Sequence, residues 1–170
     1  MYPLDYIQPV FRPPSEARSL ILQVTNGCSY NKCTFCEMYT DEDKRFSPKP
    51  IEKIEEELRG LVKAGYPVKR VFLADGDAMT LSTRRLVDIL QLISKYYPDI
   101  QRVSSYCLPR NLKKKSVEEL QDLCDLGLSL MYVGCESGDN KVLKLVNKGE
   151  DYDSSLVALT KIKQAGMKSS

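Results

Sequence analysis

Short apolar runs alternate with longer stretches of helical periodicity along this chain, and the alternation restricts the fold more than any other feature. Strands are predicted over residues 19–25, 69–74, 101–107 and 128–134. Apolar residues recurring every three or four positions predict helices over about 51–65, 82–97 and 116–127, with shorter ones around 142–146 and 156–163. Near-continuous apolar strands separated by helices favour a parallel sheet with right-handed crossovers. The expected fold class is therefore α/β, built from parallel βα repeats.

Polar or thiol-bearing segments lie at the carboxyl end of each predicted strand. They are the cysteine-rich segment 28–36, Asp75-Gly76-Asp77, Ser104–Tyr106 and Glu136-Ser137-Gly138. In parallel α/β sheets, functional groups gather on the rim where these ends meet. The alternative is that strand ends simply carry turn residues. We expect one functional site at this rim.

Three cysteines, Cys28, Cys33 and Cys36, fall within nine residues directly after the first predicted strand. Thiolates are the ligands that iron–sulfur clusters and zinc prefer. The next cysteine is Cys107, and the chain contains no histidine, so a four-ligand set of cysteine and histidine cannot be completed nearby. A centre with three protein thiolates and one open position is expected to be reactive.

Composition places the chain among ordinary globular proteins of a reducing compartment. Of its 170 residues, 42% are hydrophobic and 28% are charged, which suits one domain with a sizeable core. Six cysteines without an export signal point to thiols that serve metals, and the expected location is the cytoplasm. No apolar run approaches the ~18 residues of a membrane span. The net charge of +2 argues neither for nor against a polyanionic partner, and neither a membrane nor a nucleic acid is indicated as a partner.

The segment from Cys28 to Cys36 resembles the cluster-binding loop of the radical S-adenosylmethionine (radical SAM) superfamily. In that family, three cysteines hold a [4Fe–4S] cluster whose fourth iron chelates S-adenosylmethionine. An aromatic residue before the last cysteine, here Phe35, is typical of the family, and Glu37-Met38-Tyr39 looks like its loop exit. The spacing departs from the family, because Cys-x4-Cys-x2-Cys replaces Cys-x3-Cys-x2-Cys and the loop must absorb one extra residue. The resemblance implies that Cys28, Cys33 and Cys36 are metal ligands and that Phe35 lies at the cofactor.

The resemblance also implies cofactor contacts after the second strand. Asp75-Gly76-Asp77 stands where the family commonly has Gly-Gly-Glu. Gly76 would there permit close approach of the backbone, and Asp77 would accept the ammonium of the methionine moiety. The match is partial, because Asp75 replaces a glycine and Asp77 is shorter than glutamate. A plain loop or a weak Mg²⁺ site is the alternative.

A second set of cofactor contacts is implied after the fourth strand. Val133–Gly138, followed by Lys148-Gly149, resembles a pattern in several radical SAM groups, including methylthiotransferase-like members. Glu136 or Ser137 would then meet the ribose or the methionine carboxylate. The alternative is a helix N-cap, formed by Ser137 or Asp139, beside a surface glutamate.

The resemblance gives an expected domain organisation. We expect an extended N-terminal arm over residues 1–18, in which Tyr2, Tyr6 and Phe11 pack on the barrel, and a radical SAM-like partial barrel over residues 19–170. Met167–Ser170 looks like the opening of a fifth strand, whereas a full parallel barrel takes ~250 residues and the family's cores usually have six βα units. The implied fold is thus an incomplete TIM-like barrel, truncated at the start of the fifth strand. A complete four-stranded domain is the alternative.

The activity implied by the resemblance is that of a radical SAM enzyme acting on an unknown substrate. The cluster, reduced by a donor such as flavodoxin or ferredoxin, would cleave S-adenosylmethionine to a 5′-deoxyadenosyl radical. General-base catalysis by histidine is excluded. One alternative is a non-catalytic α/β domain whose three cysteines bind structural zinc with Asp41, Glu37 or an external ligand. Another is a thiol redox protein using Cys33 and Cys36, although that motif should open a helix directly.

Three other groups of residues have mainly structural expectations. Cys107, Cys124 and Cys135 are expected to be buried small hydrophobic residues. Lys113–Lys115 is expected to be a solvated loop. Ser104–Tyr106 could contact the cofactor from the third strand, although strand serines more often bond the backbone.

Overall fold

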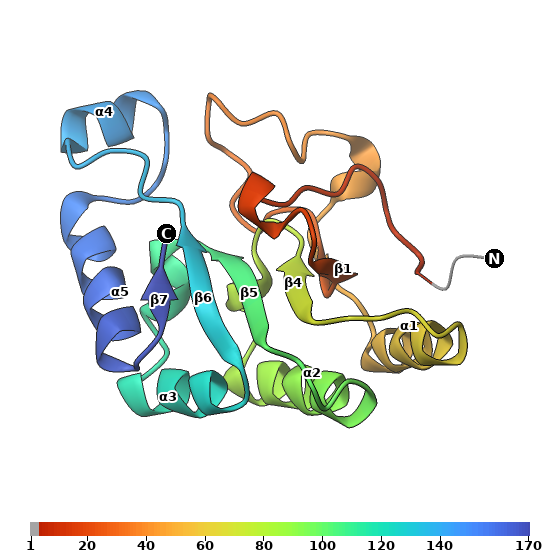
Figure 1. Cartoon of the computed structure of the whole chain (residues 1–170). Coiled ribbons are helices and arrows are strands. Elements are labelled where there is room, and N and C mark those ends of the chain that lie inside the picture. The colour runs from red at the N-terminus through yellow and green to blue at the C-terminus, as the bar shows by residue number, and fades with distance from the viewer. Residues whose placement is uncertain (1–3) are drawn as a thin grey trace.

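A five-stranded parallel sheet forms the centre of the computed structural model, which describes residues 4–170 (Figure 1). Its strands are β1 (Leu20–Gln23), β4 (Arg70–Ala74), β5 (Arg102–Cys107), β6 (Leu128–Val133) and β7 (Lys168–Ser169). They lie in that order, and each pairs in parallel with the next. The predicted α/β class with parallel βα repeats is confirmed, and β7 is the fifth strand whose opening the sequence indicated.

Helices cover one face of the sheet, and their ends follow capping residues in the sequence. They are α1 (Ile51–Lys63), α2 (Thr83–Tyr96), α3 (Val117–Asp125), α4 (Asn140–Leu145) and α5 (Tyr152–Gln164). Ser82 caps α2 by accepting from the Arg85 backbone N–H at 3.3 Å, and Ser116 forms a capping box with Glu119 at the start of α3. Figure 1 shows α1, α2, α3 and α5 along one side of the sheet, while α4 lies beyond the carboxyl ends of the strands.

The main core lies between these helices and the sheet. Fully buried aliphatic side chains from β1, β4, α1 and α2 form much of it: Leu22, Leu73, Ile54, Leu58, Leu61, Leu86, Ile89, Leu90 and Ile93. Burial of each such side chain contributes about 1.5–3 kcal/mol relative to exposure. This layer holds the strands in place and therefore sets the position of the rim formed by their carboxyl ends.

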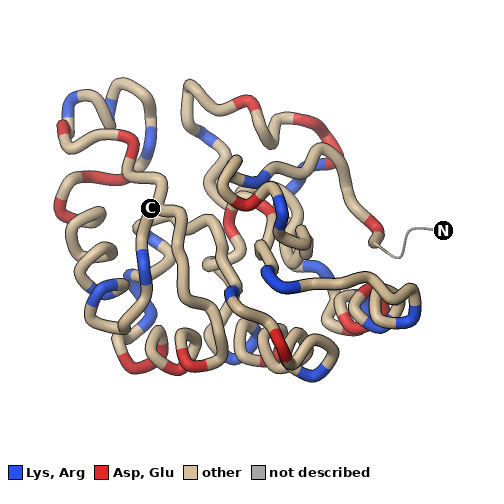
Figure 2. The backbone as a smooth tube through the Cα atoms, in the orientation of Figure 1, with Lys and Arg blue, Asp and Glu red and all other residues tan. Residues whose placement is uncertain are grey.

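Charged residues follow the division between core and surface. Both signs are scattered over the helices and loops, while the middle of the sheet carries almost none (Figure 2). Within residues 4–170, no helix combines the length and the apolar character that crossing a membrane requires.

Residues 4–18 lie against the sheet and contain no strand, only the helical turn η1 (Pro14–Glu16). The Tyr6 hydroxyl donates to the Ile21 carbonyl at 2.7 Å, and the Ile7 backbone N–H donates to Gln23 Oε1 at 2.9 Å. Tyr2, which the sequence analysis assigned to the same arm, lies outside the described residues. The segment is thus attached to β1 by side-chain contacts rather than by strand pairing.

Glu16 of η1 is buried on the face of the sheet opposite the helices. Its Oε1 accepts from Arg102 Nη2 at 2.6 Å and from the Tyr132 hydroxyl at 2.9 Å. Tyr132 in turn lies close to Phe72 and Tyr106, with ring centroids 6.2 and 6.3 Å away. Aromatic side chains therefore line the inner face of β4, β5 and β6.

The first predicted strand is interrupted at Val24. After β1, residues Thr25–Asn26 form β2, which pairs antiparallel with β3 (Ser47–Pro48). This ribbon closes the base of a loop, residues 27–46, that carries the three clustered cysteines and includes one helical turn, η2 (Glu42–Lys44). With so little regular structure, the shape of this cysteine loop depends on its contacts with the rest of the chain.

Candidate functional site

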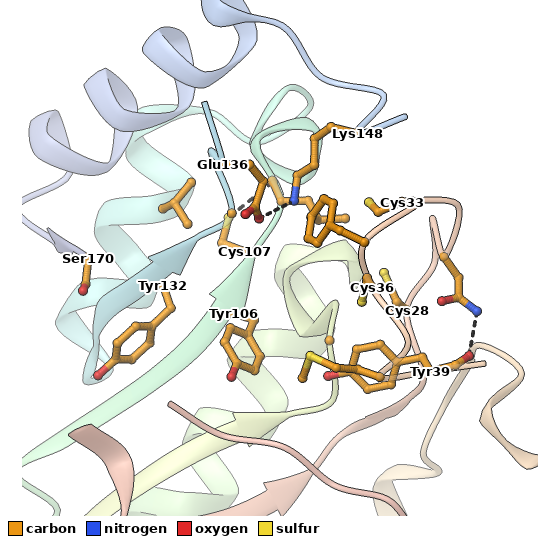
Figure 3. A pocket seen from close by; sticks show the side chains of 17 residues that line it. Cys28, Cys33, Cys36, Tyr39, Tyr106, Cys107, Tyr132, Glu136, Lys148 and Ser170 are labelled. Carbon is orange, nitrogen blue, oxygen red and sulfur yellow. Dashed lines mark hydrogen bonds and ion pairs between the residues drawn. The ribbon is translucent and has the colours of Figure 1, made fainter. Parts of the chain in front are cut away.

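A cavity of about 250 Å³ opens at the carboxyl ends of β5 and β6, with the cysteine loop on one side (Figure 3). Six of the eight site residues predicted from the sequence line it: Cys28, Cys33, Phe35, Cys36, Gly76 and Glu136. Other lining residues had no firm assignment from the sequence: Met38, Tyr39, Tyr106, Cys107, Leu108, Tyr132, Val133, Gly134 and Lys148. Separate parts of the chain, from the cysteine loop to Lys148, thus meet at the predicted rim.

The three thiols face this cavity from the loop. Figure 3 shows Cys28 and Cys36 side by side, with Cys33 farther out toward Glu136 and Lys148. Burial raises the pKa of the Cys28 thiol, and burial likewise raises the pKa of the Cys33 thiol, against the opposing effect of the Lys148 ammonium. Because metal ligands must be deprotonated, these thiols need a bound cation to hold them as thiolates.

Lys148 is the cation of the site, and the sequence analysis assigned it no role. Its side chain is 5% exposed, and Nζ lies 2.8 Å from Glu136 Oε1 and 5.7 Å from the centroid of the Phe35 ring. A Cβ atom at Gly134 would come within 2.9 Å of Nζ, so glycine leaves room for the pair. The only sequence signal was the Lys148-Gly149 dipeptide after the fourth strand.

Asp77, which the resemblance would place at the cofactor, does not line the cavity. It is fully buried, and the Ser29 hydroxyl of the cysteine loop donates to its Oδ2. Burial raises the pKa of Asp77 to about 6. As arranged here, Asp77 holds the loop next to Cys28.

The buried Asp77 carboxyl gives a prediction for the pH dependence of stability. Its pKa is about 6 in the folded chain against 3.8 ordinarily, so the folded state binds the proton more tightly than the unfolded state. The free energy of unfolding of the wild type, relative to Asp77→Asn, should therefore fall between about pH 4 and pH 6, by up to about 3 kcal/mol. Urea denaturation of both reduced apo-proteins across this range measures the difference. A difference that rises with pH, or stays flat, would contradict the assignment.

Ser137 also lies outside the cavity lining. Its hydroxyl accepts from the Asp139 backbone N–H at 3.0 Å, and Asp139 caps α4 by accepting from the Lys141 backbone N–H at 2.7 Å. The N-cap alternative is therefore realised, by Asp139. Glu136 remains at the cavity, with its backbone in the left-handed region at φ 61°.

Asp75 forms a buried centre of contacts that the sequence analysis did not foresee. Its Oδ2 lies 2.5 Å from Lys44 Nζ, with both side chains 0% exposed. The same oxygen accepts from Gln23 Nε2 at 2.9 Å and from the Gly27 backbone N–H at 3.2 Å. Asp75 thereby joins β1, the start of the cysteine loop and the end of that loop. Asp75 therefore serves as a structural anchor for these three segments.

Gly76 is required by an aromatic neighbour. A Cβ atom at this position would lie 2.3 Å from the Tyr39 ring. Tyr39 is buried, and burial raises the pKa of its phenol well above the ordinary value. Its hydroxyl has no hydrogen-bond partner among the described residues. The Tyr39 ring, which follows the three clustered cysteines in the sequence, thus occupies the space that a side chain at position 76 would fill.

Several structural expectations need correction. Cys107 is buried as predicted, whereas Cys124 and Cys135 are only partly buried. Lys115 is not solvated, because its Nζ is buried and donates to the Leu81 carbonyl at 2.6 Å. Ser104 and Ser105 bond backbone carbonyls, and Tyr106 is the member of that stretch that reaches the cavity.

The two alternatives for the cysteines meet geometric difficulties. Cys33 and Cys36 are joined by a turn, in which the Cys36 backbone N–H donates to the Cys33 carbonyl at 3.3 Å, and no helix opens there. Zinc holds tetrahedral sulfur ligands at about 2.3 Å and hence close to one another. Among residues 4–170, no three histidine, cysteine, aspartate or glutamate side chains are gathered for a single metal ion. A zinc site would need the thiols to move together.

The chain is similar to known proteins over most of its length. The family model of the radical SAM superfamily matches residues 22–170. The 4′-phospho-dehydrooxetanocin synthase of Priestia megaterium is 27% identical over 165 residues, which is 88% of this chain and 22% of that protein. The chain therefore spans about a fifth of the length of this curated relative.

Solved structures share the fold. The structure of the cobalamin-dependent S-adenosylmethionine radical enzyme OxsB matches with a TM-score of 0.72 at 21% identity, over 89% of this chain and 23% of that one. The radical S-adenosylmethionine methyltransferase TsrM from Kitasatospora setae matches with a TM-score of 0.65 at 18% identity, over 89% and 30%. At these identities the likeness establishes the fold, a partial barrel of βα units.

Proposed function

We propose that the thiol-lined cavity binds a [4Fe–4S] cluster and S-adenosylmethionine, since this chain belongs to the radical SAM superfamily. The observation that carries the proposal is the convergence of Cys28, Cys33 and Cys36 on one cavity at the carboxyl rim of a parallel sheet. When bound, such a cluster supplies the electron that cleaves S-adenosylmethionine to a 5′-deoxyadenosyl radical, which attacks a substrate still to be identified. Flavodoxin or ferredoxin is the proposed electron donor.

The donor set fits a cluster with one open iron. Three thiols line the cavity, and each is free of disulfide bonding. The [4Fe–4S] clusters of proteins are held by cysteine thiolates, and a set of three leaves one iron for an exogenous ligand. Lys148 places a positive charge beside Cys33, which favours its thiolate form.

The remaining cavity residues are suited to hold and shield a charged cofactor. Lys148 and Glu136 offer one cationic and one anionic group for the carboxylate and ammonium of a methionine moiety, at the cost of opening their own pair. Phe35, Tyr106 and Tyr132 supply apolar surface that limits the access of water. Exclusion of water strengthens every electrostatic interaction within the cavity.

Cobalamin forms no part of this proposal. Cobalamin is bound in the solved structures of OxsB and TsrM. This chain matches only 23% and 30% of them, at identities that establish the fold alone.

Low-temperature EPR of the anaerobically reconstituted, dithionite-reduced protein tests the proposal. We expect a [4Fe–4S]⁺ signal whose g values shift when S-adenosylmethionine is added, because its amino and carboxylate groups would complete the open iron. Methionine at the same concentration is the control for weak, nonspecific ligation. A cluster signal indifferent to the cofactor would contradict the open-site assignment. Folded protein that takes up zinc but no iron–sulfur cluster would replace the proposal by the zinc alternative.

A further inference from the structure

The four residues between Cys28 and Cys33, residues 29–32, each make a contact that fixes their position; we name them the spacer. Ser29 donates to Asp77, and Asn31 Nδ2 donates to the Tyr39 carbonyl at 2.7 Å. Tyr30 and Lys32 contact residues near the end of α4, more than a hundred positions later in the chain. Despite the extra residue of the Cys-x4-Cys spacing, all four residues of the spacer are therefore held by contacts with other segments.

Asn147 and its neighbour Val146 make the contacts that bracket Cys33. Its Nδ2 donates to the Lys32 carbonyl at 2.8 Å, on one side of that cysteine. On the other side, the Thr34 backbone N–H donates to the Val146 carbonyl at 3.0 Å. The Tyr30 hydroxyl donates to the Asn147 carbonyl at 2.9 Å. The peptide groups before and after Cys33 are thus both bonded to the short segment 146–147.

The backbone conformation of residues 147–149 leaves room for the Tyr30 side chain of the spacer. Asn147 has φ 48° and Gly149 has φ 69°, both in the left-handed region that asparagine and glycine tolerate. A Cβ atom at Gly149 would lie 2.4 Å from the Tyr30 hydroxyl oxygen, so any other residue would displace Tyr30. Arg110 stacks over the Tyr30 ring at 4.0 Å while its Nε donates to Glu150 at 2.7 Å. The Tyr30 side chain is therefore enclosed by two separate segments, residues 147–150 and the turn that carries Arg110.

We propose that Asn147 is a positioning residue for Cys33, holding it in register with Cys28 and Cys36 despite the longer spacer. The inference rests on the proposed function, because it takes Cys33 to be a cluster ligand. A ligand held in place before the cluster arrives loses less conformational entropy on binding. Partners that orient metal ligands typically change metal affinity by 10–100-fold when removed. Asn147 would act through the Lys32 carbonyl and Tyr30 without touching the cluster.

Two substitutions at Asn147 separate its side-chain bond from its backbone conformation. Asn147→Asp keeps a residue that tolerates the left-handed region but replaces the donor amide by an acceptor facing the Lys32 carbonyl. Asn147→Gly keeps the backbone freedom and removes the side chain. Asn140→Asp is the matched control, because Asn140 is the first residue of α4, the short helix that precedes Asn147, and its Oδ1 accepts from the Tyr152 backbone N–H, away from the cysteine loop.

The first measurement is the alkylation rate of each thiol in the reduced apo-protein, followed by mass spectrometry of peptides. Both Asn147 variants should alkylate Cys33 several-fold faster than the wild type, while Cys28 and Cys36 keep their rates. The second is the loss of iron from the reconstituted protein to a chelator, together with the midpoint potential of the cluster. We expect on the order of tenfold faster loss in both variants and a shifted potential, with Asn140→Asp unchanged.

The outcomes distinguish this inference from the proposed function. If the wild type binds no cluster, the proposed function fails, and the alkylation rates still decide whether Asn147 positions Cys33. Unchanged Cys33 alkylation in both variants would overturn the inference. Equal acceleration at all three cysteines would overturn it as well, because it would mean general loosening of the loop. Wild-type behaviour of Asn147→Gly alone would assign the effect to the backbone and overturn the role of the amide.

Discussion

Substitution of Cys33 by alanine should leave the reconstituted protein with almost no [4Fe–4S] cluster and no EPR signal. Cys28 and Cys36 would remain, and two thiolates cannot hold three irons of a cube. The other cavity thiol, Cys107, is fully buried at the end of β5, and burial raises the pKa of that thiol, so it is a poor replacement. We expect iron content to fall from about four per chain to near zero, measured together with visible absorbance.

The matched control for this substitution is Cys124→Ala on α3. Cys124 is partly buried and does not line the cavity, so cluster content should stay at the wild-type value. Far-ultraviolet circular dichroism of both apo-proteins checks that the fold is retained. A Cys33→Ala protein that still takes up a full cluster would exclude Cys33 as a ligand. Equal loss of cluster in Cys124→Ala would show that the effect comes from damage to the fold.

The second large effect is expected at the buried pair of Lys44 and Asp75. The two side chains are fully buried, so removing one charge leaves the other unpaired away from water. Breaking a buried pair in this way costs about 3–5 kcal/mol. Lys44→Met and Asp75→Asn should each lower the free energy of unfolding of the reduced apo-protein by about that amount, measured by urea denaturation.

Two further variants make this prediction specific to burial. The double variant Lys44→Met/Asp75→Asn should lose less stability than the sum of the single variants, because neither charge is then left alone. Lys53→Met breaks an exposed pair, in which Lys53 and Glu56 are 60% and 54% exposed. It should change the free energy of unfolding by less than about 1 kcal/mol. Similar losses in Lys53→Met and Lys44→Met would refute the assigned role of burial.

The elements of the sheet could be predicted because their signals are local. The apolar runs before Asp75 and Glu136 indicated β4 and β6, and apolar residues recurring over 116–127 indicated α3. The bounds of a strand could not be predicted from its apolar run where some of its residues pair with a different strand. The first strand ends early because Thr25–Asn26 turn to pair with β3.

The structure brings six of the eight predicted site residues to one cavity and leaves Asp77 and Ser137 outside its lining. Gly76 and Glu136 line the cavity with the cysteines, as their positions at the carboxyl ends of parallel strands indicated. Asp77 and Ser137 lie one residue farther along and turn elsewhere, to Ser29 and to the Asp139 backbone. Sequence position alone cannot distinguish neighbouring residues whose side chains leave a turn in different directions.

The order of strands and helices, the parallel sheet and the location of the thiols were determined by the sequence itself, because periodicity and residue type act over a few positions. Only the tertiary structure decided which residues far apart in the sequence contact one another. Lys44 meets Asp75 across 31 positions, and Tyr30 meets Asn147 across 117. Such pairs form because the sheet brings its strand ends together, and burial then makes a polar group without a partner costly. The cysteines could be read from the chain, while the contacts that hold them in place could be read only from the fold.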